Sequence, residues 1–239
     1  MIDENINKIR LDIPDYVELI AISKTKPNDD IMKAYENGHR SFGENKIQEM
    51  SRKFEELPKD IIWHMVGHVQ SNKIKYMAPY VNLIHGVDSF KSIKIINKEG
   101  QKNNRILNCL LQLKVSKEES KFGLEADALK KIIFSDEYRE MENIKISGIM
   151  AMATNTTNKD IVRNEFIYAK NIFDEISATE NNFEILSMGM SNDYHLAIEC
   201  GSNMIRIGSL IFGDRNYCYY LCDCRHRDNR RQIQSRKNN

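Results

Sequence analysis

Short apolar runs alternate with longer amphipathic stretches along most of the chain. Apolar runs bounded by glycine or proline are typical of buried strands, whereas charged stretches with apolar positions three or four residues apart are typical of helices. The pattern predicts strands at 17–25, 41–44, 61–67, 82–87, 106–115, 144–153, 183–189 and 204–212. It predicts helices between them at 30–36, 46–57, 90–98, 126–141, 160–176 and 192–199.

Regular alternation of strands and helices indicates parallel strands joined by right-handed crossovers. Eight such units favour a closed (β/α)₈ barrel of the TIM type over an open doubly wound sheet. No glycine-rich dinucleotide fingerprint follows the first strand, because Ser23-Lys24-Thr25-Lys26 stands there instead. We therefore expect a single barrel domain over residues 1–215.

Composition fits a globular protein, with 41% hydrophobic and 29% charged residues in 239. The net charge is +1, of which residues 216–239 contribute +4, so that the rest of the chain carries about −3. A near-neutral barrel gives no reason to expect nucleic-acid binding. No apolar run approaches the roughly 20 residues that cross a bilayer, and the N-terminus lacks a secretory pattern. The five cysteines do not form a set of pairs distributed along the chain, as a disulfide framework would. This favours a reduced, cytoplasmic protein.

The C-terminal segment 216–239 is basic and cysteine-containing, and we expect it to be disordered. Its potential zinc ligands crowd into nine residues, whereas structural zinc sites bring together two separated ligand pairs. We therefore expect no metal site there; the residues in question are Cys218, Cys222, Cys224 and His226.

Lys24 follows the first predicted strand, and Pro27 prevents that strand from continuing. A partly desolvated lysine at a barrel edge has a nucleophilic amine that can condense with an aldehyde to form a Schiff base. The segment alone also fits a lysine that merely flanks a strand and reaches water, and Lys26 is expected to face solvent.

Barrel closure brings strand 8 beside strand 1, and phosphate groups often bind at the loops after strands 7 and 8 of such barrels. Ser191 follows strand 7 and offers a hydroxyl to an anion, unless it only caps the next helix. Gly208 permits close approach of a ligand, and Ser209 adds a second hydroxyl. Arg206 lies on the same strand face as Gly208. If that face points into the barrel, the buried arginine needs a hydrogen-bond acceptor. The alternative is an arginine on the surface of the protein.

A phosphate, a ring nitrogen and an aldehyde would satisfy these loops, Arg206 and Lys24 together, and pyridoxal 5′-phosphate (PLP) carries all three. The alternative is a sugar- or nucleotide-phosphate barrel enzyme in which Lys24 binds substrate directly.

Five motifs in order resemble the pyridoxal phosphate homeostasis protein family (YggS/PROSC) over residues 1–215. They are Ala21-Ile22-Ser23-Lys24-Thr25-Lys26-Pro27, Phe42-Gly43-Glu44-Asn45, the segment 63–73 (WHMVGHVQSNK), Leu186-Ser187-Met188-Gly189-Met190-Ser191 and the segment 206–213 (RIGSLIFG).

The resemblance implies a barrel like the N-terminal domain of alanine racemase, with PLP held as an internal aldimine on Lys24. It also implies a phosphate cradle and an arginine facing the pyridine nitrogen, and it places an asparagine near the cofactor. The phosphate cradle matches Ser191, Gly208 and Ser209. The arginine matches Arg206, and the asparagine matches Asn45. His64 lies in a family motif, but we expect it to be a core histidine with satisfied hydrogen bonds.

The resemblance implies a PLP carrier that buffers the cofactor or supplies it to PLP-dependent apoenzymes, without a catalytic residue of its own. An arginine at the ring nitrogen disfavours ring protonation, which weakens the ring as an electron sink. Racemases of this type also add a β-rich domain, for which only about 25 residues remain after strand 8. The alternative is a racemase-like PLP enzyme. We expect a monomer or weak homodimer without membrane contact.

Overall fold

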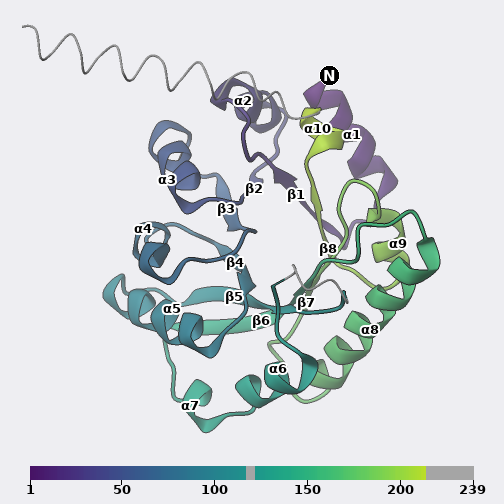
Figure 1. The fold of residues 1–239 in the computed structure, drawn as a ribbon. Coiled ribbons are helices and arrows are strands. Elements are labelled where there is room, and N and C mark those ends of the chain that lie inside the picture. The colour runs from purple at the N-terminus through teal and green to yellow at the C-terminus, as the bar shows by residue number, and fades with distance from the viewer. Residues whose placement is uncertain (117–121, 214–239) are drawn as a thin grey trace, which may run out of the picture.

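Eight parallel strands form a closed barrel in the computed structural model of the protein, which describes residues 1–116 and 122–213. Figure 1 shows the strands inside a ring of helices. The strands are β1 (Glu18–Ile22), β2 (Ser41–Glu44), β3 (Ile62–Met65), β4 (Leu83–Val87), β5 (Leu107–Leu113), β6 (Ile144–Ala151), β7 (Ile185–Ser187) and β8 (Met204–Ile207). The predicted barrel is therefore confirmed.

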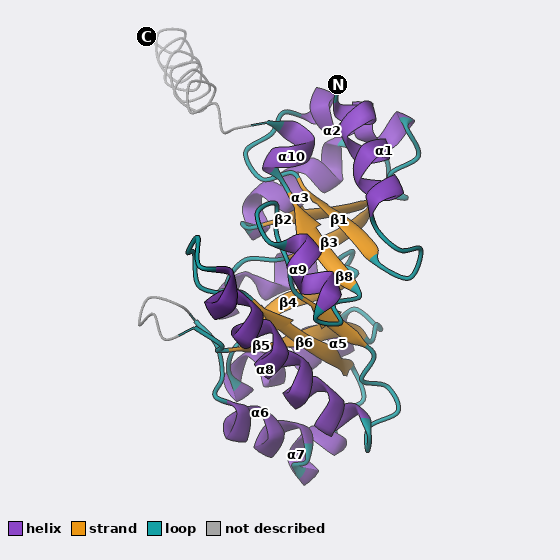
Figure 2. Cartoon of the chain, turned by 90° about the vertical axis from the view of Figure 1, so that its right-hand side faces the viewer, coloured by secondary structure: helices purple, strands orange, loops and turns teal. Residues whose placement is uncertain are grey.

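Helices surround the barrel, most of them between consecutive strands (Figure 2). They are α1 (Ile2–Asp12), α2 (Asn28–Glu36), α3 (Ile47–Glu56), the 3₁₀ turn η1 (Ser71–Lys73), α4 (Ile74–Met77), α5 (Phe90–Lys102), α6 (Ala126–Ile133), α7 (Asp136–Arg139), α8 (Lys159–Ser177), α9 (Tyr194–Glu199) and α10 (Ser209–Phe212). No helix among the described residues is long and apolar enough to cross a membrane.

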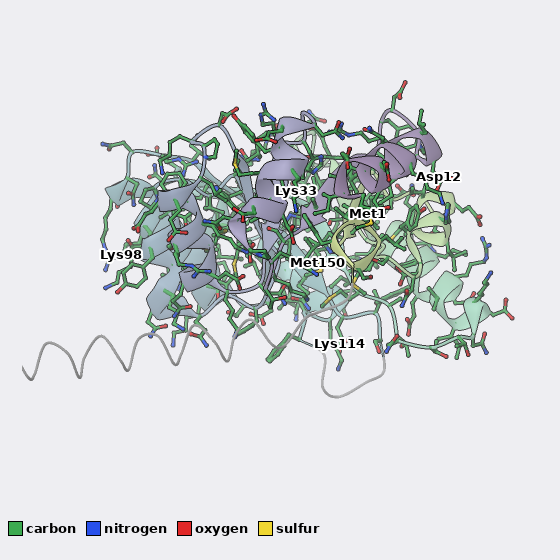
Figure 3. The ribbon with its side chains drawn as sticks, turned by 90° about the horizontal axis from the view of Figure 1, so that it is seen from above. Met1, Asp12, Lys33, Lys98, Lys114 and Met150 are labelled. Carbon is green, nitrogen blue, oxygen red and sulfur yellow. The ribbon has the colours of Figure 1, made fainter. Side chains whose placement is uncertain are left out.

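The apolar core has two parts, as expected when strand side chains alternate between faces. The larger part fills the layer between the strands and helices, where Phe42, Trp63 and Phe166 are fully buried. A smaller cluster inside the barrel includes Ile20, Ile22, Leu83, Leu110, Met150 and Met204. Figure 3 shows Met150 near the middle of the molecule and Lys98 at its edge. The barrel interior is thus filled by side chains rather than open.

Closure joins β8 to β1 and fixes which residues meet near the candidate site. Ile20 pairs with Arg206, and Ala21 pairs with Ile207. The next positions in register are Ile22 and Gly208, and a Cβ placed on Gly208 would lie 3.5 Å from the Ile22 Cβ. The loops after β1 and β8 are consequently neighbours.

Two predicted elements run across a break in the observed structure. The predicted strand 204–212 ends at Ile207, because Gly208 turns the chain and its carbonyl accepts hydrogen bonds from Ile211 N and Phe212 N to start α10. The predicted helix 126–141 is broken into α6 and α7, because the Ser135 side chain caps α7 through Tyr138 N.

Three helical segments were absent from the predicted elements. Helix α1 buries Ile6 and Ile9 and contacts α2 and α10, and η1 with α4 forms the connection after β3. The predicted extension 216–239 lies outside the described residues, so its expected disorder stays a prediction.

Gly148 in β6 is required by close backbone packing. Its φ is +155°, and a Cβ there would lie 1.8 Å from the Ile185 carbonyl oxygen of β7. We expect Gly148→Ala to lower the free energy of unfolding by about 3 kcal/mol or more, because the clash is with backbone. Urea denaturation measures this change.

The control for this variant is Gly38→Ala. Gly38 also has a positive φ, +78°, but its Cβ would meet no atom within 4 Å. We expect a cost of about 1 kcal/mol there, from conformation alone. Equal losses in both variants would contradict the role of the β6–β7 contact.

Candidate functional site

The predicted site residues gather at the C-terminal end of the barrel strands, as expected for this fold. Lys24 lies two residues beyond β1, Ser191 lies in the loop after β7, and Gly208 and Ser209 follow β8. Because β1 pairs with β8, and β8 with β7, these loops are adjacent in space. The prediction that strands 1, 7 and 8 act together fits this arrangement.

Lys24 occupies a tight turn. Lys26 N donates to the Ser23 carbonyl at 3.0 Å, and Thr25 has a left-handed backbone with φ 67°. Lys24 is half-buried between the fully buried Ser23 and the start of α2. Lys24 therefore lies at the rim of the barrel rather than fully in water.

Lys26 is held against the protein rather than turned only to solvent. Its Nζ donates to the carbonyl oxygens of Phe212 and Gly213, at 2.9 and 3.0 Å. These carbonyls end α10, so Lys26 ties the loop after β1 to the loop after β8. The expectation that Lys26 faces solvent was wrong for its amine.

Ser191 contacts the neighbouring loop instead of capping a helix. Helix α9 begins at Tyr194 with Asp193 as the residue before it, and Asp193 Oδ1 accepts from Met190 N at 2.6 Å. The Ser191 hydroxyl oxygen accepts from Gly208 N at 3.4 Å. Two of the predicted phosphate-binding residues are thus in direct contact, and Ser209 follows with an exposed position.

Space remains over Gly208. Its backbone is not left-handed, with φ −118°, and a Cβ would make only ordinary contacts, the nearest at 3.5 Å. Packing among the described residues therefore does not require glycine at this position. A glycine here keeps open a place where a ligand can approach the backbone.

Arg206 points into the barrel and is 5% exposed. Its guanidinium donates to Ser187 Oγ at 2.7 Å and to the Ala151 carbonyl at 3.0 Å, both neutral acceptors. Burial lowers the pKa of Arg206 to about 10, while the charge of Asp193 acts in the opposite direction. The inward orientation predicted for Arg206 fits the structure, and the surface alternative does not.

Asn45 lies at the same end of the barrel, just after β2, and is exposed. A Cβ on Gly67 would lie 2.4 Å from the Asn45 carbonyl oxygen, so the loops after β2 and β3 are closely packed. Within the described residues, no side-chain hydrogen bond joins Asn45 to the other predicted site residues. Its role near a cofactor stays a prediction.

A line of polar side chains inside the barrel was missed by sequence reasoning. Ser187 Oγ lies 3.2 Å from His85 Nδ1, and His85 Nε2 lies 3.1 Å from His64 Nδ1. Both histidines are fully buried, and burial lowers the pKa of His64 to about 3 and that of His85 well below its usual range. The alternation of side chains along β3 and β4 places both histidines on the inner face of the barrel, and this was the signal in the sequence that could have found them.

Arg206 can only donate, so Ser187 Oγ accepts from it. One arrangement of protons satisfies the rest of the line: the Ser187 hydroxyl donates to His85 Nδ1, and neutral His85 donates from Nε2 to His64 Nδ1. In this arrangement His64 carries its proton on Nε2, which is buried, lacks a hydrogen-bond partner among the described residues and lies 3.8 Å from Glu18 Oε1. The expected core histidine is confirmed as buried, but its hydrogen bonds are only half satisfied.

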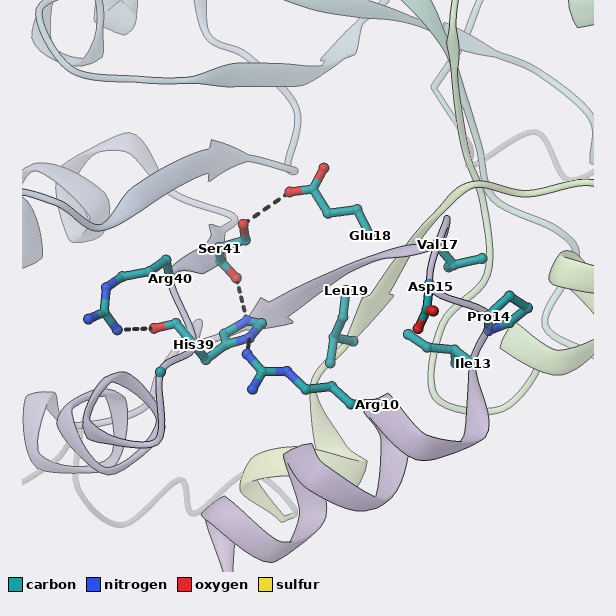
Figure 4. A pocket seen from close by; sticks show the side chains of 11 residues that line it. Arg10, Ile13, Pro14, Asp15, Val17, Glu18, Leu19, His39, Arg40 and Ser41 are labelled. Carbon is teal, nitrogen blue, oxygen red and sulfur yellow. Dashed lines mark hydrogen bonds between the residues drawn. The ribbon is translucent and has the colours of Figure 1, made fainter.

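A pocket of about 420 Å³ lies at the opposite, N-terminal end of β1 and β2 (Figure 4). Arg10 donates to His39 Nδ1 at 3.1 Å, and His39 Nε2 then donates to the Ser41 carbonyl at 2.8 Å. Burial lowers the pKa of His39 to about 4. Lys24 and the loops after β7 and β8 do not line this pocket, so it is not the candidate site.

Comparison with known proteins agrees with the fold and the motifs. Residues 1–216 match the family described as alanine racemase, N-terminal domain. A pyridoxal phosphate homeostasis protein of Aquifex aeolicus is 38% identical over 203 residues, which cover 84% of this chain and 88% of that protein. The chain belongs to the pyridoxal phosphate homeostasis protein family.

Solved structures extend this family relationship. PipY of Synechococcus elongatus PCC7942, solved with PLP bound, has a TM-score of 0.81 and 30% identity, covering 89% of this chain and all of that one. An alanine racemase of Clostridium difficile 630 has a TM-score of 0.74 at 13% identity, which shows a shared fold alone. The match to that racemase covers 91% of this chain and 61% of the racemase.

Buried neutral histidines make stability depend on pH. The pKa values of His39, His64 and His85 are lowered in the folded protein, so the unfolded chain binds more protons below about pH 6.5. Each histidine therefore removes up to about 1.4 kcal/mol of stability per pH unit as pH falls from about 6.5 toward its folded pKa. We expect His39→Gln to flatten the fall of unfolding free energy between pH 6.5 and 4.

Urea denaturation across this pH range measures the slope. The control is His195→Gln at an exposed position. Glu44 changes the unfolding free energy with pH in the opposite direction, because burial raises its pKa to about 7. The test is therefore the difference in slope between the variant and wild type, not the slope of either protein alone. Equal slopes for His39→Gln and wild type would contradict a lowered pKa of His39 in the folded protein.

Proposed function

We propose that this protein binds PLP covalently through Lys24 and serves as a PLP carrier in cofactor homeostasis, without substantial turnover. The observation that carries the proposal is the placement of Arg206, a buried cation with neutral hydrogen-bond partners, on the inner face of β8, two residues before the Gly208 that contacts Ser191, on the strand that pairs with β1. A phosphorylated pyridine aldehyde complements this arrangement in charge and in hydrogen-bonding groups.

The described residues fit PLP group by group. Space over Gly208 and the hydroxyls of Ser191 and Ser209 suit a phosphate, whose negative charge also offsets that of Arg206. Arg206 would face the ring nitrogen, and Lys24 would bind the aldehyde carbon. PLP supplies an electron-accepting ring when bound. The PLP-bound structure of PipY, at 30% identity, supports the same ligand.

Two features favour a carrier over an enzyme. An arginine beside the ring nitrogen keeps a proton off that atom, which weakens electron withdrawal. Relatives at up to 38% identity are named homeostasis proteins rather than enzymes. PLP-dependent apoenzymes are the proposed recipients, and the proposed setting is the cytoplasm.

Absorbance spectroscopy and borohydride reduction test the covalent site. We expect PLP-loaded wild type to show an absorbance band near the edge of the visible range, from the lysine-linked Schiff base, and to yield a pyridoxyl adduct on Lys24 after reduction. Lys24→Ala should lose the band and the adduct, because the amine is gone. The matched control is Lys33→Ala, whose exposed amine pairs with Asp30 on α2. An adduct on Lys26, or none in wild type, would contradict the site.

Exchange of the α-proton tests the enzyme alternative. We expect holo-protein incubated with L- or D-alanine in deuterated water to exchange far slower than about one per second, the low end of usual enzyme turnover. NMR follows the loss of the α-proton signal. Exchange at or above that rate, lost in Lys24→Ala, would favour the racemase-like function over the carrier.

A further inference from the structure

We propose that Glu44, Lys53 and Glu49 are positioning residues that hold the turn around Lys24 and direct its amine into the mouth of the barrel. This inference rests on the proposed function of Lys24. The three residues come from β2 and α3, so neither the first strand nor the loops after β7 and β8 supply them.

The two neighbours of Lys24 in sequence are both attached to this cluster. Lys53 Nζ donates to the Ser23 carbonyl at 2.8 Å, and Ser23 Oγ donates to Glu44 Oε1 at 2.6 Å. On the other side, Thr25 N donates to Glu49 Oε1 at 2.7 Å. The peptide of Lys24 is therefore fixed at both ends by one set of buried charges.

Lys53 connects the two carboxylates. Its Nζ donates to Glu44 Oε1 at 2.7 Å and to Glu49 Oε1 at 2.8 Å, in addition to the Ser23 carbonyl. An ammonium has three donors, so all of them are used. The lysine side chain is 0% exposed, which prevents water from competing for these bonds.

The contact with Glu49 explains an unusual backbone. Thr25 is β-branched and has φ 67°, a conformation that such residues rarely adopt. Its N–H is held by a carboxylate, which makes a stronger hydrogen bond than a neutral acceptor. Strain of this kind persists where surrounding contacts determine the conformation, and it gathers at functional sites.

Charge balance argues against a purely stabilising role. Burial raises the pKa of Glu44 to about 7 against the attraction of Lys53, and Glu44 Oε2 has no hydrogen-bond partner among the described residues. Burying such a cluster is often no better for stability than packing apolar residues. Its hydrogen bonds to backbone go to the residues on either side of Lys24, which favours positioning of that amine.

The test compares the rate at which PLP forms the covalent adduct. Purified apo-protein is mixed with excess PLP between pH 6 and 9, the absorbance band is followed, and borohydride mapping identifies the modified lysine. The variants are Glu49→Ala, Glu49→Gln and Lys53→Met. The control is Lys33→Met, because Lys33 lies on α2 and its exposed amine pairs with Asp30 of the same helix.

We expect Glu49→Ala to slow adduct formation on Lys24 about tenfold or more, since misplacement of a reacting group is costly. Glu49→Gln should recover part of the rate, because its amide oxygen still accepts from Thr25 N. Lys53→Met should be slowed at least as much as Glu49→Ala, and Lys33→Met should stay within about twofold of wild type.

Circular dichroism and thermal melting separate misfolding from mispositioning. If Lys53→Met does not fold, the Glu49→Ala and Glu49→Gln pair decides. A folded Glu49→Ala protein with the wild-type rate and pH profile would overturn the positioning role and leave the proposed function intact. A wild-type protein that forms no adduct on Lys24 would contradict the proposed function, and the positioning role with it.

Discussion

The barrel encloses the positive charge of Arg206, which no carboxylate among residues 1–116 and 122–213 pairs with directly. Arg206 lies on the inner face of β8 and bonds to a serine hydroxyl and a backbone carbonyl. A buried cation of this kind is costly unless its surroundings or a bound anion compensate for it. An anion bound near Arg206 would compensate for this charge. The loops after β7 and β8, the open position over Gly208 and the adjacent Lys24 suit the binding of such an anion. Together they favour an anionic, aldehyde-bearing aromatic ligand.

The architecture was largely predictable from the sequence, because each strand–helix unit carries its own hydrophobic period. The closed barrel follows from that local signal, and so do all eight strand starts, each within two residues of its predicted position. Gly208 misled the prediction, because an apolar run continues past it while the backbone turns into α10. The short α4 carries too few turns to show a period, and α1 precedes the strand–helix pattern on which the prediction relied.

The candidate site was predicted where motif and topology agreed, as at Lys24, Ser191, Gly208 and Arg206. Sequence reasoning missed groups that act through partners distant in the chain. Glu44 belongs to a recognised motif, yet its bond to Lys53 depends on how α3 packs against β2. Likewise, Ser187 and His85 are 102 residues apart, and only barrel closure brings them together. Such pairings have no local sequence period.

The one-way line of hydrogen bonds through the barrel has an electrostatic consequence. When the Ser187 hydroxyl donates to His85, each member presents a lone pair toward Arg206 and an N–H or O–H bond toward Glu18, so the side-chain dipoles point the same way. Their negative ends face the guanidinium and their positive end faces a carboxylate at the other mouth of the barrel. The line thus solvates a buried cation as a file of oriented water molecules does. Groups that both donate and accept, such as serine and neutral histidine, are the side chains suited to it.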